Sequence, residues 1–196
     1  MTLGVFGYGS LINRHTWAAP KPYARARLNG FVRQWRQRIA VDGQPVTSMA
    51  IARKEGSVID GLVFVEDYAS LPALDERERG YDRIDAGPHL EVVPGDTLEG
   101  IDVLAVPRVT YLTQTEHQHW ASDEAPILHS YLDVIITGVR REFGEEGVAR
   151  YVETTEGWDL PIWDDRAAPR YPRAVELSAA ERDYIDGLLR ELRKGG

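Results

Sequence analysis

Apolar residues in the first half of the chain follow patterns that are typical of β-strands. Leu3, Val5 and Phe6 predict a short buried strand that ends at Gly7. Apolar and polar residues alternate from Ala26 to Ile39, which predicts a longer strand with one buried face. The other predicted strands are 47–53 and 58–65, joined as a hairpin around Lys54-Glu55-Gly56, and 89–93 and 101–106.

Helical spacing of apolar residues begins at Tyr68–Arg79 and dominates the second half. Ser70 is the predicted cap of this first helix, and Gly80 is a typical helix stop. Because strands come first and helices later, the order favours an α+β fold over an alternating parallel sheet. The later predicted helices are 124–143, capped by Ser122 or Asp123, and a last helix opened by the capping box Ser178-Ala-Ala-Glu181.

Composition limits the classes of function. The chain has 196 residues, enough for one domain with a sizeable core. It contains no cysteine, which excludes disulfides, thiolate metal sites and cysteine nucleophiles. A net charge of −8 argues against non-specific nucleic-acid binding. With no secretory signal and no apolar run near the ~18 residues of a membrane span, we expect a cytoplasmic protein without a nucleic-acid or membrane partner.

A glycine-rich turn follows the first strand. Gly7 and Gly9 flank Tyr8, and glycine both tolerates positive φ angles and lets a ligand approach the backbone. Successive N–H groups in such a turn bind carboxylate or carbonyl oxygens. The segment lacks the spacing and the Lys-Ser/Thr pair of a phosphate loop. A plain turn from strand to loop is the alternative interpretation.

A cluster of carboxylates ends the first predicted helix. Asp75, Glu76 and Glu78 lie within four residues, and 76 and 78 point to different helix faces, so at most one is expected in a common pocket. A carboxylate that acts as a base near neutral pH needs a pKa raised above about 4.3 by burial or by a like charge. The alternative is a solvated helix end that Arg77 and Arg79 neutralise.

Two further features, a row of arginines and an aromatic, charged segment, each have two interpretations. A row of arginines on the second predicted strand forms either a solvated outer face, which we favour, or a contact for a substrate carboxylate. The segment 158–173, which is rich in aromatic and charged residues, forms either a lid over a site or a structural strap. The arginines are Arg25, Arg27, Arg33, Arg36 and Arg38.

Together, Tyr8-Gly9-Ser10-Leu11 and Leu74-Asp-Glu-Arg-Glu78 resemble the γ-glutamylcyclotransferase superfamily, with its ChaC-like and AIG2-like members. Their order, spacing and flanking strands agree over residues 3 to 140. The resemblance implies a small mixed β-barrel with surrounding helices, and a single domain over 1–196 on which 151–196 packs as a C-terminal extension. It implies Glu78 as the catalytic residue. The substrate-binding residues that it implies are Gly7, Tyr8, Gly9, Ser10, Leu11, Tyr81 and Tyr131, of which the last two fit core packing equally well.

The resemblance also implies a reaction. The α-amine of a γ-glutamyl substrate attacks its own γ-carbonyl, and 5-oxoproline is released without a metal or cofactor. Glu78 would act first as base and then as acid, in a lyase-type cyclotransferase of glutathione metabolism. Glutathione, γ-glutamyl amino acids and γ-glutamyl amines all fit as the small-molecule substrate. A non-catalytic binding protein with the same pocket, and a γ-glutamylamine hydrolase or transferase, are the alternatives; the oligomeric state stays open.

Overall fold

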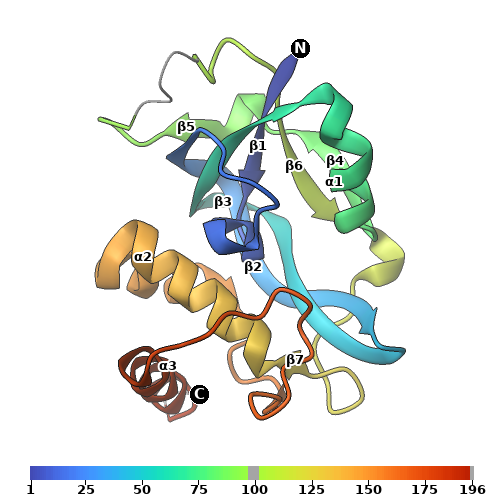
Figure 1. Cartoon of the computed structure of the whole chain (residues 1–196), viewed down its shortest axis with the longest axis vertical. Coiled ribbons are helices and arrows are strands. Elements are labelled where there is room, and N and C mark those ends of the chain that lie inside the picture. Colours follow the sequence, from blue (N-terminus) through green and yellow to red (C-terminus); the bar gives the residue numbers. More distant parts are fainter. Residues whose placement is uncertain (97–101, 195–196) are drawn as a thin grey trace.

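A curled, mixed β-sheet forms a half-barrel, around which the helices pack (Figure 1). The computed structural model describes residues 1–96 and 102–194, and within them three α-helices lie around the sheet. The predicted α+β class with a small mixed barrel is therefore confirmed. The strands are β1 (Thr2–Gly7), β2 (Tyr23–Val41), β3 (Gln44–Asp67), β4 (Tyr81–Asp85), β5 (Leu90–Val92), β6 (Arg108–Thr113), β7 (Ile127–Leu128), β8 (Thr155–Glu156) and β9 (Ile162–Trp163), and the helices are α1 (Leu71–Arg77), α2 (His129–Glu153) and α3 (Ala179–Leu192).

The strand β1 lies in the middle of the sheet, whose order is β4-β6-β1-β3-β2-β5. It pairs antiparallel with β3 on one side and parallel with β6 on the other. Its residues after Thr2 are buried, as its apolar composition predicts. The turn that follows Gly7 therefore leaves the sheet at its centre, where neighbouring elements surround it.

The helix α2 packs between the sheet and α3 (Figure 1). Residues 130–139 of α2 are all buried, which is the pattern of a helix enclosed on every side. Only Ile185 and Leu189 of α3 are buried, so α3 is a surface helix with one apolar stripe. The predicted capping box is confirmed, since the Ser178 hydroxyl accepts from the Glu181 N–H and the Glu181 carboxylate accepts from the Ser178 N–H. Within the described ranges, none of the helices is both long and apolar enough to cross a membrane.

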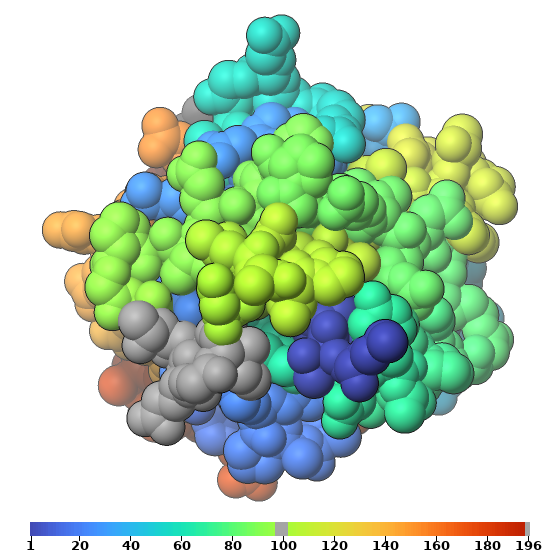
Figure 2. All heavy atoms as spheres, turned by 90° about the horizontal axis from the view of Figure 1, so that it is seen from above, coloured from blue at the N-terminus to red at the C-terminus, as the bar shows by residue number. Residues whose placement is uncertain are grey.

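Two strand predictions are wrong. The expected hairpin around 54–56 does not form, because β3 continues through this region and both of its halves pair with β2, as Phe31 with Arg53 and Asn29 with Val58. The intervening residues bulge outward, and Figure 2 shows this part of the chain in teal, projecting from the surface. The expected strand 101–106 also fails: residues 102–106 form turns, and Ile101 lies outside the described residues.

The helix predictions are correct in place but differ at the ends. A 3₁₀ turn, Tyr68–Ser70, precedes α1, and the Ser70 side chain forms no capping hydrogen bond. The helix α2 begins at His129 instead of 124, and neither Ser122 nor Asp123 caps it. The reason lies in the sheet. The Thr47 N–H donates a hydrogen bond to the Pro126 carbonyl, and Thr47 pairs with Ile127, so Ile127 and Leu128 form the strand β7. The helix then runs to Glu153 through a kink at Gly144.

Candidate active site

A small pocket lies where the turn after β1 meets the end of α1. Its volume is about 30 Å³. Every residue expected at the site lines this pocket except Gly7, which is the last residue of β1 and pairs with Leu62. The lining residues are Phe6, Tyr8, Gly9, Ser10, Leu11, Met49, Glu78, Tyr81, Tyr111 and Tyr131.

Close contacts, and not positive φ angles, explain why the turn contains glycines. A Cβ atom on Gly7 would lie 2.4 Å from the Cβ of Leu11, so glycine lets the chain fold back at once into the 3₁₀ turn Ser10–Ile12. Gly9 has φ −113°, and a Cβ there would lie 3.1 Å from the Tyr131 hydroxyl. Neither glycine has a positive φ angle, so close approach is the property of glycine that this turn uses.

The backbone N–H groups of residues 8 to 11 are available to a ligand. The carbonyls of Gly9 and Ser10 accept from the N–H groups of Ile12 and Asn13, both at 3.0 Å. Among the described residues, none accepts a hydrogen bond from the N–H groups of 8 to 11. Because buried N–H groups are nearly always paired, such a set beside a pocket is a typical subsite for an anionic oxygen.

A buried cation fixes this turn from behind. Arg33 is fully buried; its Nε donates to the Tyr8 carbonyl at 3.0 Å, and the Tyr151 hydroxyl donates to the same carbonyl at 3.3 Å. In a planar trans peptide the N–H points opposite to the C=O, so this contact aims the Gly9 N–H away from Arg33. The favoured interpretation of Arg33 as part of a solvated face is wrong, because β2 turns this side chain into the core.

The tyrosine hydroxyls of the pocket hold its walls together. Tyr8 donates to the Tyr111 carbonyl at 2.7 Å, and Tyr81 donates to the Met49 carbonyl at 2.6 Å. Tyr131 accepts from the Met49 N–H at 3.4 Å. Burial raises the pKa of Tyr8, Tyr81 and Tyr131 well above the usual value of 10.0, so these phenols stay protonated at neutral pH.

Glu78 is the carboxylate of the cluster that lines the pocket. It occupies the C-terminal cap of α1, where Gly80 at φ +90° lets the chain turn into β4. Its side chain is 17% exposed, and its Oε1 lies 3.2 Å from the Nε of Arg77. Burial raises the pKa of Glu78 above 4.5, although Arg77 and Arg173 act in the opposite direction. A carboxyl group with this raised pKa in a pocket is suited to proton transfer.

The charged side chains next to Glu78 in the sequence already have hydrogen-bond or ion-pair partners. Asp75 accepts from the Tyr111 hydroxyl at 2.7 Å and pairs with Arg83, and Glu76 pairs with Arg79 at the surface. Arg77 is largely buried instead of solvated: it donates to the carbonyl and the hydroxyl of Thr16 at 3.0 and 3.2 Å. Glu78 is thus the carboxylate of the three that keeps lone pairs facing the pocket.

The segment between β9 and α3 packs behind one wall residue of the pocket, Tyr131. The ring of Tyr171 packs on Tyr131 with centroids 4.8 Å apart, and its N–H donates to the Ser130 hydroxyl at 3.2 Å. The buried carboxylate of Asp165 accepts from the N–H of Ser130 at 2.8 Å and from its hydroxyl at 2.6 Å. These bonds tie the segment to the start of α2, beside the pocket.

A row of aromatic rings continues from this segment into the core. The ring of Trp35, which is fully buried, meets Tyr131 edge-on at 6.0 Å and Trp158 at 5.6 Å between centroids. The ring of Tyr131 in turn packs against the ring of Tyr171. The expected start of the C-terminal extension, residue 151, lies inside α2. The chain after this residue is therefore joined to the pocket wall by α2 itself and by the ring contacts of Trp158 and Tyr171.

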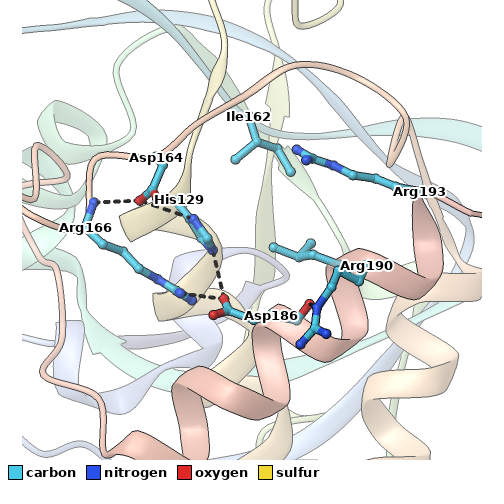
Figure 3. Close-up of a pocket in the computed structure, with 8 residues that line it drawn as sticks. His129, Ile162, Asp164, Arg166, Asp186, Arg190 and Arg193 are labelled. Atoms are coloured by element: carbon cyan, nitrogen blue, oxygen red, sulfur yellow. Dashed lines mark hydrogen bonds and ion pairs between the residues drawn. The ribbon is translucent and has the colours of Figure 1, made fainter.

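Among the larger hollows elsewhere, two are lined in part by residues of α2. One, of about 370 Å³, lies between α2, β9 and α3 (Figure 3). There Arg166 bridges Asp186 and Asp133, while His129 faces Asp164 at 3.6 Å and Asp186 at 3.8 Å. The other, of about 630 Å³, lies beside the outward bulge of β3, where Arg27 and Arg150 pair with Asp60. Most of the charged side chains that line the two hollows already have partners.

Comparison with known proteins identifies the fold. No protein-family model matches the chain, and no curated protein matches its sequence. A solved structure named gamma-glutamyl cyclotransferase is 19% identical, with a TM-score of 0.59 over 95% of this chain and 99% of that one. An uncharacterized protein from Homo sapiens is 19% identical, with a TM-score of 0.54 over 94% and 98%. YkqA from Bacillus subtilis is 16% identical, with a TM-score of 0.53 over 80% and 56%. The chain therefore has the fold of the gamma-glutamyl cyclotransferase-like proteins.

Proposed function

We propose that this protein is a cytoplasmic γ-glutamyl cyclotransferase that releases 5-oxoproline from a γ-glutamyl substrate. The observation that carries the proposal is the meeting, in one pocket, of a largely buried carboxyl group with a raised pKa and a turn of unpaired N–H groups. The two come from residues about 70 positions apart, at the end of β1 and the end of α1. A similar fold in a structure named gamma-glutamyl cyclotransferase supports the same activity.

In the proposed reaction Glu78 moves protons from the attacking nitrogen to the leaving nitrogen. The ionised carboxylate takes a proton from the α-ammonium of the substrate, and the free amine attacks the γ-carbonyl carbon. A five-membered lactam forms as the γ-amide C–N bond breaks, and Glu78 returns the proton to the leaving nitrogen. The attacking nitrogen gives up a second proton as it becomes the lactam N–H, and the released amine takes up that proton and leaves as an ammonium. Atoms and charges then balance without water. Proton transfer of this kind accelerates a reaction by about 10²–10⁴-fold.

The glycine-rich turn would hold the substrate folded for ring closure. Its N–H groups are suited to the α-carboxylate or to the oxyanion that develops on the γ-carbonyl. Holding the amine and the carbonyl in contact removes much of the entropic cost of cyclisation. The Ser10 hydroxyl lies at the same end of the pocket and adds one possible contact to this set.

The pocket must open to admit a substrate, because about 30 Å³ is too small for a glutamyl group. Ser10, Glu78 and Tyr81 are the partly exposed members of its lining, whereas Tyr8, Tyr111 and Tyr131 are buried. We therefore place the entrance on the side of Glu78. The buried tyrosines form the fixed wall, because the hydroxyls of Tyr8 and Tyr131 are bonded to the backbone and that of Tyr111 to Asp75.

A product screen tests this function. The protein is incubated with glutathione, with γ-glutamyl amino acids and with γ-glutamyl amines, and 5-oxoproline and free glutamate are measured. We expect 5-oxoproline in stoichiometric amounts with the released amine. Free glutamate instead would indicate a hydrolase, and binding without any product would indicate a non-catalytic binding protein; either result would overturn the proposal.

A further inference from the structure

Arg33 is a fully buried cation whose hydrogen-bond acceptors are all neutral. Its Nε donates to the Tyr8 carbonyl and its Nη1 to the Thr154 hydroxyl, both at 3.0 Å, and its Nη2 donates to the Asp60 carbonyl. In the part of the chain that the structure describes, no carboxylate forms an ion pair with Arg33, and that of Asp60 is paired with two other arginines. A guanidinium keeps its proton when it is buried, and a buried charge without an ionic partner is costly. Because a neutral donor could hold the same oxygens at a lower cost, the charge itself calls for an explanation.

The guanidinium of Arg33 is fixed between β2 and the end of α2. The Arg33 N–H donates to the Thr154 carbonyl at 3.0 Å, and the Arg33 Cζ lies over the ring of Tyr151, 4.0 Å from its centroid. The side chain does not line the pocket, whereas Tyr8 and Gly9 do. Any effect of Arg33 on a ligand must therefore pass through the peptide between Tyr8 and Gly9.

This peptide connects the buried charge to the pocket. Its carbonyl accepts from Arg33, and the Gly9 N–H points the opposite way, at a residue that lines the pocket. Among the described residues, none accepts a hydrogen bond from this N–H. A cation on the carbonyl polarises the peptide and strengthens its N–H as a donor, because linked hydrogen bonds reinforce one another in a medium of low dielectric constant. The positive charge also attracts an anion directly, and salt screens a buried charge only weakly.

We propose that Arg33 is a positioning residue whose buried charge, acting through the Tyr8–Gly9 peptide, sets the affinity of the turn after β1 for the α-carboxylate of its ligand. This inference rests on the proposed function, which supplies the identity of the ligand. Arg33 itself touches neither the substrate nor the reacting atoms. The product 5-oxoproline keeps the α-carboxylate of the substrate, so the effect can be measured at equilibrium, without turnover.

A matched pair of ligands isolates the charge. 5-Oxoproline and 5-oxoprolinamide share one ring, but the first carries a carboxylate and the second a neutral amide. Isothermal titration calorimetry gives both Kd values for the wild type and for Arg33→Met, which replaces the buried ion with an apolar chain. We expect the wild type to bind 5-oxoproline more tightly than the amide, and this preference to fall about tenfold or more in Arg33→Met. The affinity for the amide should change by less than about threefold.

Two further variants separate the charge from a purely structural role. Arg33→Lys keeps the charge and loses the planar fork of donors, and it should keep the preference within about threefold of the wild type. Thr154→Val is the matched control, because it removes one acceptor of the guanidinium and leaves the charge in place. It should keep the preference within about twofold of the wild type. Circular dichroism shows whether each variant is folded.

The wild-type protein provides a test that does not depend on the folding of any variant. Salt weakens the attraction of exposed cations for an anion much more than that of a buried one. The preference for 5-oxoproline over its amide should therefore change by less than about threefold between about 0.05 M and about 1 M sodium chloride. A fall of about tenfold would show that exposed cations supply the attraction, and it would overturn the role of Arg33.

The outcomes separate the two proposals. If the protein releases 5-oxoproline but the preference is unchanged in Arg33→Met, or falls equally in Arg33→Lys or in Thr154→Val, the inference about Arg33 is overturned and the proposed function stands. If no substrate of the screen yields 5-oxoproline, the proposed function fails. The role of Arg33 then stands if 5-oxoproline binds with the expected dependence on the charge of Arg33, and it fails if 5-oxoproline does not bind.

Discussion

The molecule contains two clusters of charged side chains, one beside α2 and α3 and one near the pocket, and their ion pairing differs. We call Asp133, Arg166 and Asp186 the helix cluster, and Glu78, Arg77 and Arg173 the pocket cluster. In the helix cluster Arg166 donates to both oxygens of Asp133 at 2.6 and 2.7 Å and to Asp186 at 2.5 Å. In the pocket cluster a single contact of 3.2 Å joins Arg77 to Glu78.

The pKa shifts follow this difference in pairing. Burial works against the charge on Arg166, but hydrogen bonds and charges from Asp133 and Asp186 outweigh it and raise the pKa of Arg166. At Glu78 burial prevails over the attraction of Arg77 and Arg173, and the pKa of the carboxyl group rises. Arg166, with carboxylates on both sides, keeps its proton and has a structural role. Glu78, with one contact and a raised pKa, can exchange a proton near neutral pH. The larger hollow beside the helix cluster is thus a poorer candidate for chemistry than the smaller pocket.

The largest expected effect is the loss of turnover in Glu78→Gln. The amide can neither accept the ammonium proton nor return it, so kcat should fall by about 10²–10⁴-fold. Release of 5-oxoproline from γ-glutamylalanine measures it. The control is Glu76→Gln, because Glu76 lies on the same helix end with a side chain 67% exposed. Near-normal activity in Glu78→Gln would remove this residue from the mechanism.

The next effect is on stability, in the helix cluster. Asp133→Asn removes the buried carboxylate that binds Arg166 through two hydrogen bonds, and the free energy of unfolding should fall by about 3 kcal/mol. Urea denaturation followed by circular dichroism measures this change. Asp183→Asn, at an exposed position of α3, should change it by less than about 0.5 kcal/mol. A fall in kcat for Asp133→Asn without any loss of stability would contradict the division of roles between the clusters.

A smaller effect concerns the pH dependence of the reaction. Arg173 lowers the pKa of Glu78, so Arg173→Gln should raise it and move the acid limb of kcat/KM to higher pH. A pH profile measured with γ-glutamylalanine reports this shift. As a control, Arg170→Gln should leave the acid limb in place. A limb that moves to lower pH in Arg173→Gln would show that the cation does not act on Glu78.

The smallest effect is a gain of stability in Glu78→Gln. The folded protein raises the pKa of Glu78, so ionisation of this group destabilises the fold as pH rises through that pKa. The variant cannot ionise, and it should melt at a higher temperature than the wild type at pH 8. Below pH 4.5, where Glu78 is protonated in both folded and unfolded states, the two should melt together. An equal difference at both pH values would point to packing instead of charge.

Local patterns predicted the parts of the site that lie in one segment. The glycine-rich turn and Glu78 each stand out in the sequence, and β1 and α1 were predicted close to their observed bounds. Glu78 was named through a resemblance to known proteins, because its own segment shows only a cluster of carboxylates. Periodicity could not place the start of α2, since Ile127 enters the sheet only through its contact with Thr47.

Residues that join the site from distant elements left no local signal. Met49 and Tyr111 look like ordinary strand residues, and they reach the pocket only because β3 and β6 flank β1. Arg33 looks like one member of a solvated row, but a bend in β2 buries it behind the turn. The register shifts in the pairing of β2 with β3, between 29 and 31 and between 35 and 37, decide which side each residue faces.

The aromatic row from Trp158 through Trp35 and Tyr131 to Tyr171 gives the molecule a built-in optical reporter. Coupled rings held in fixed, chiral geometry produce strong near-ultraviolet circular dichroism, and Trp35 emits from a fully buried position. A compound that enters beside Tyr131 must disturb the last two rings of the row. Ligands can therefore be screened by unlabelled spectroscopy, before any product is known, and the signal originates at the pocket wall itself.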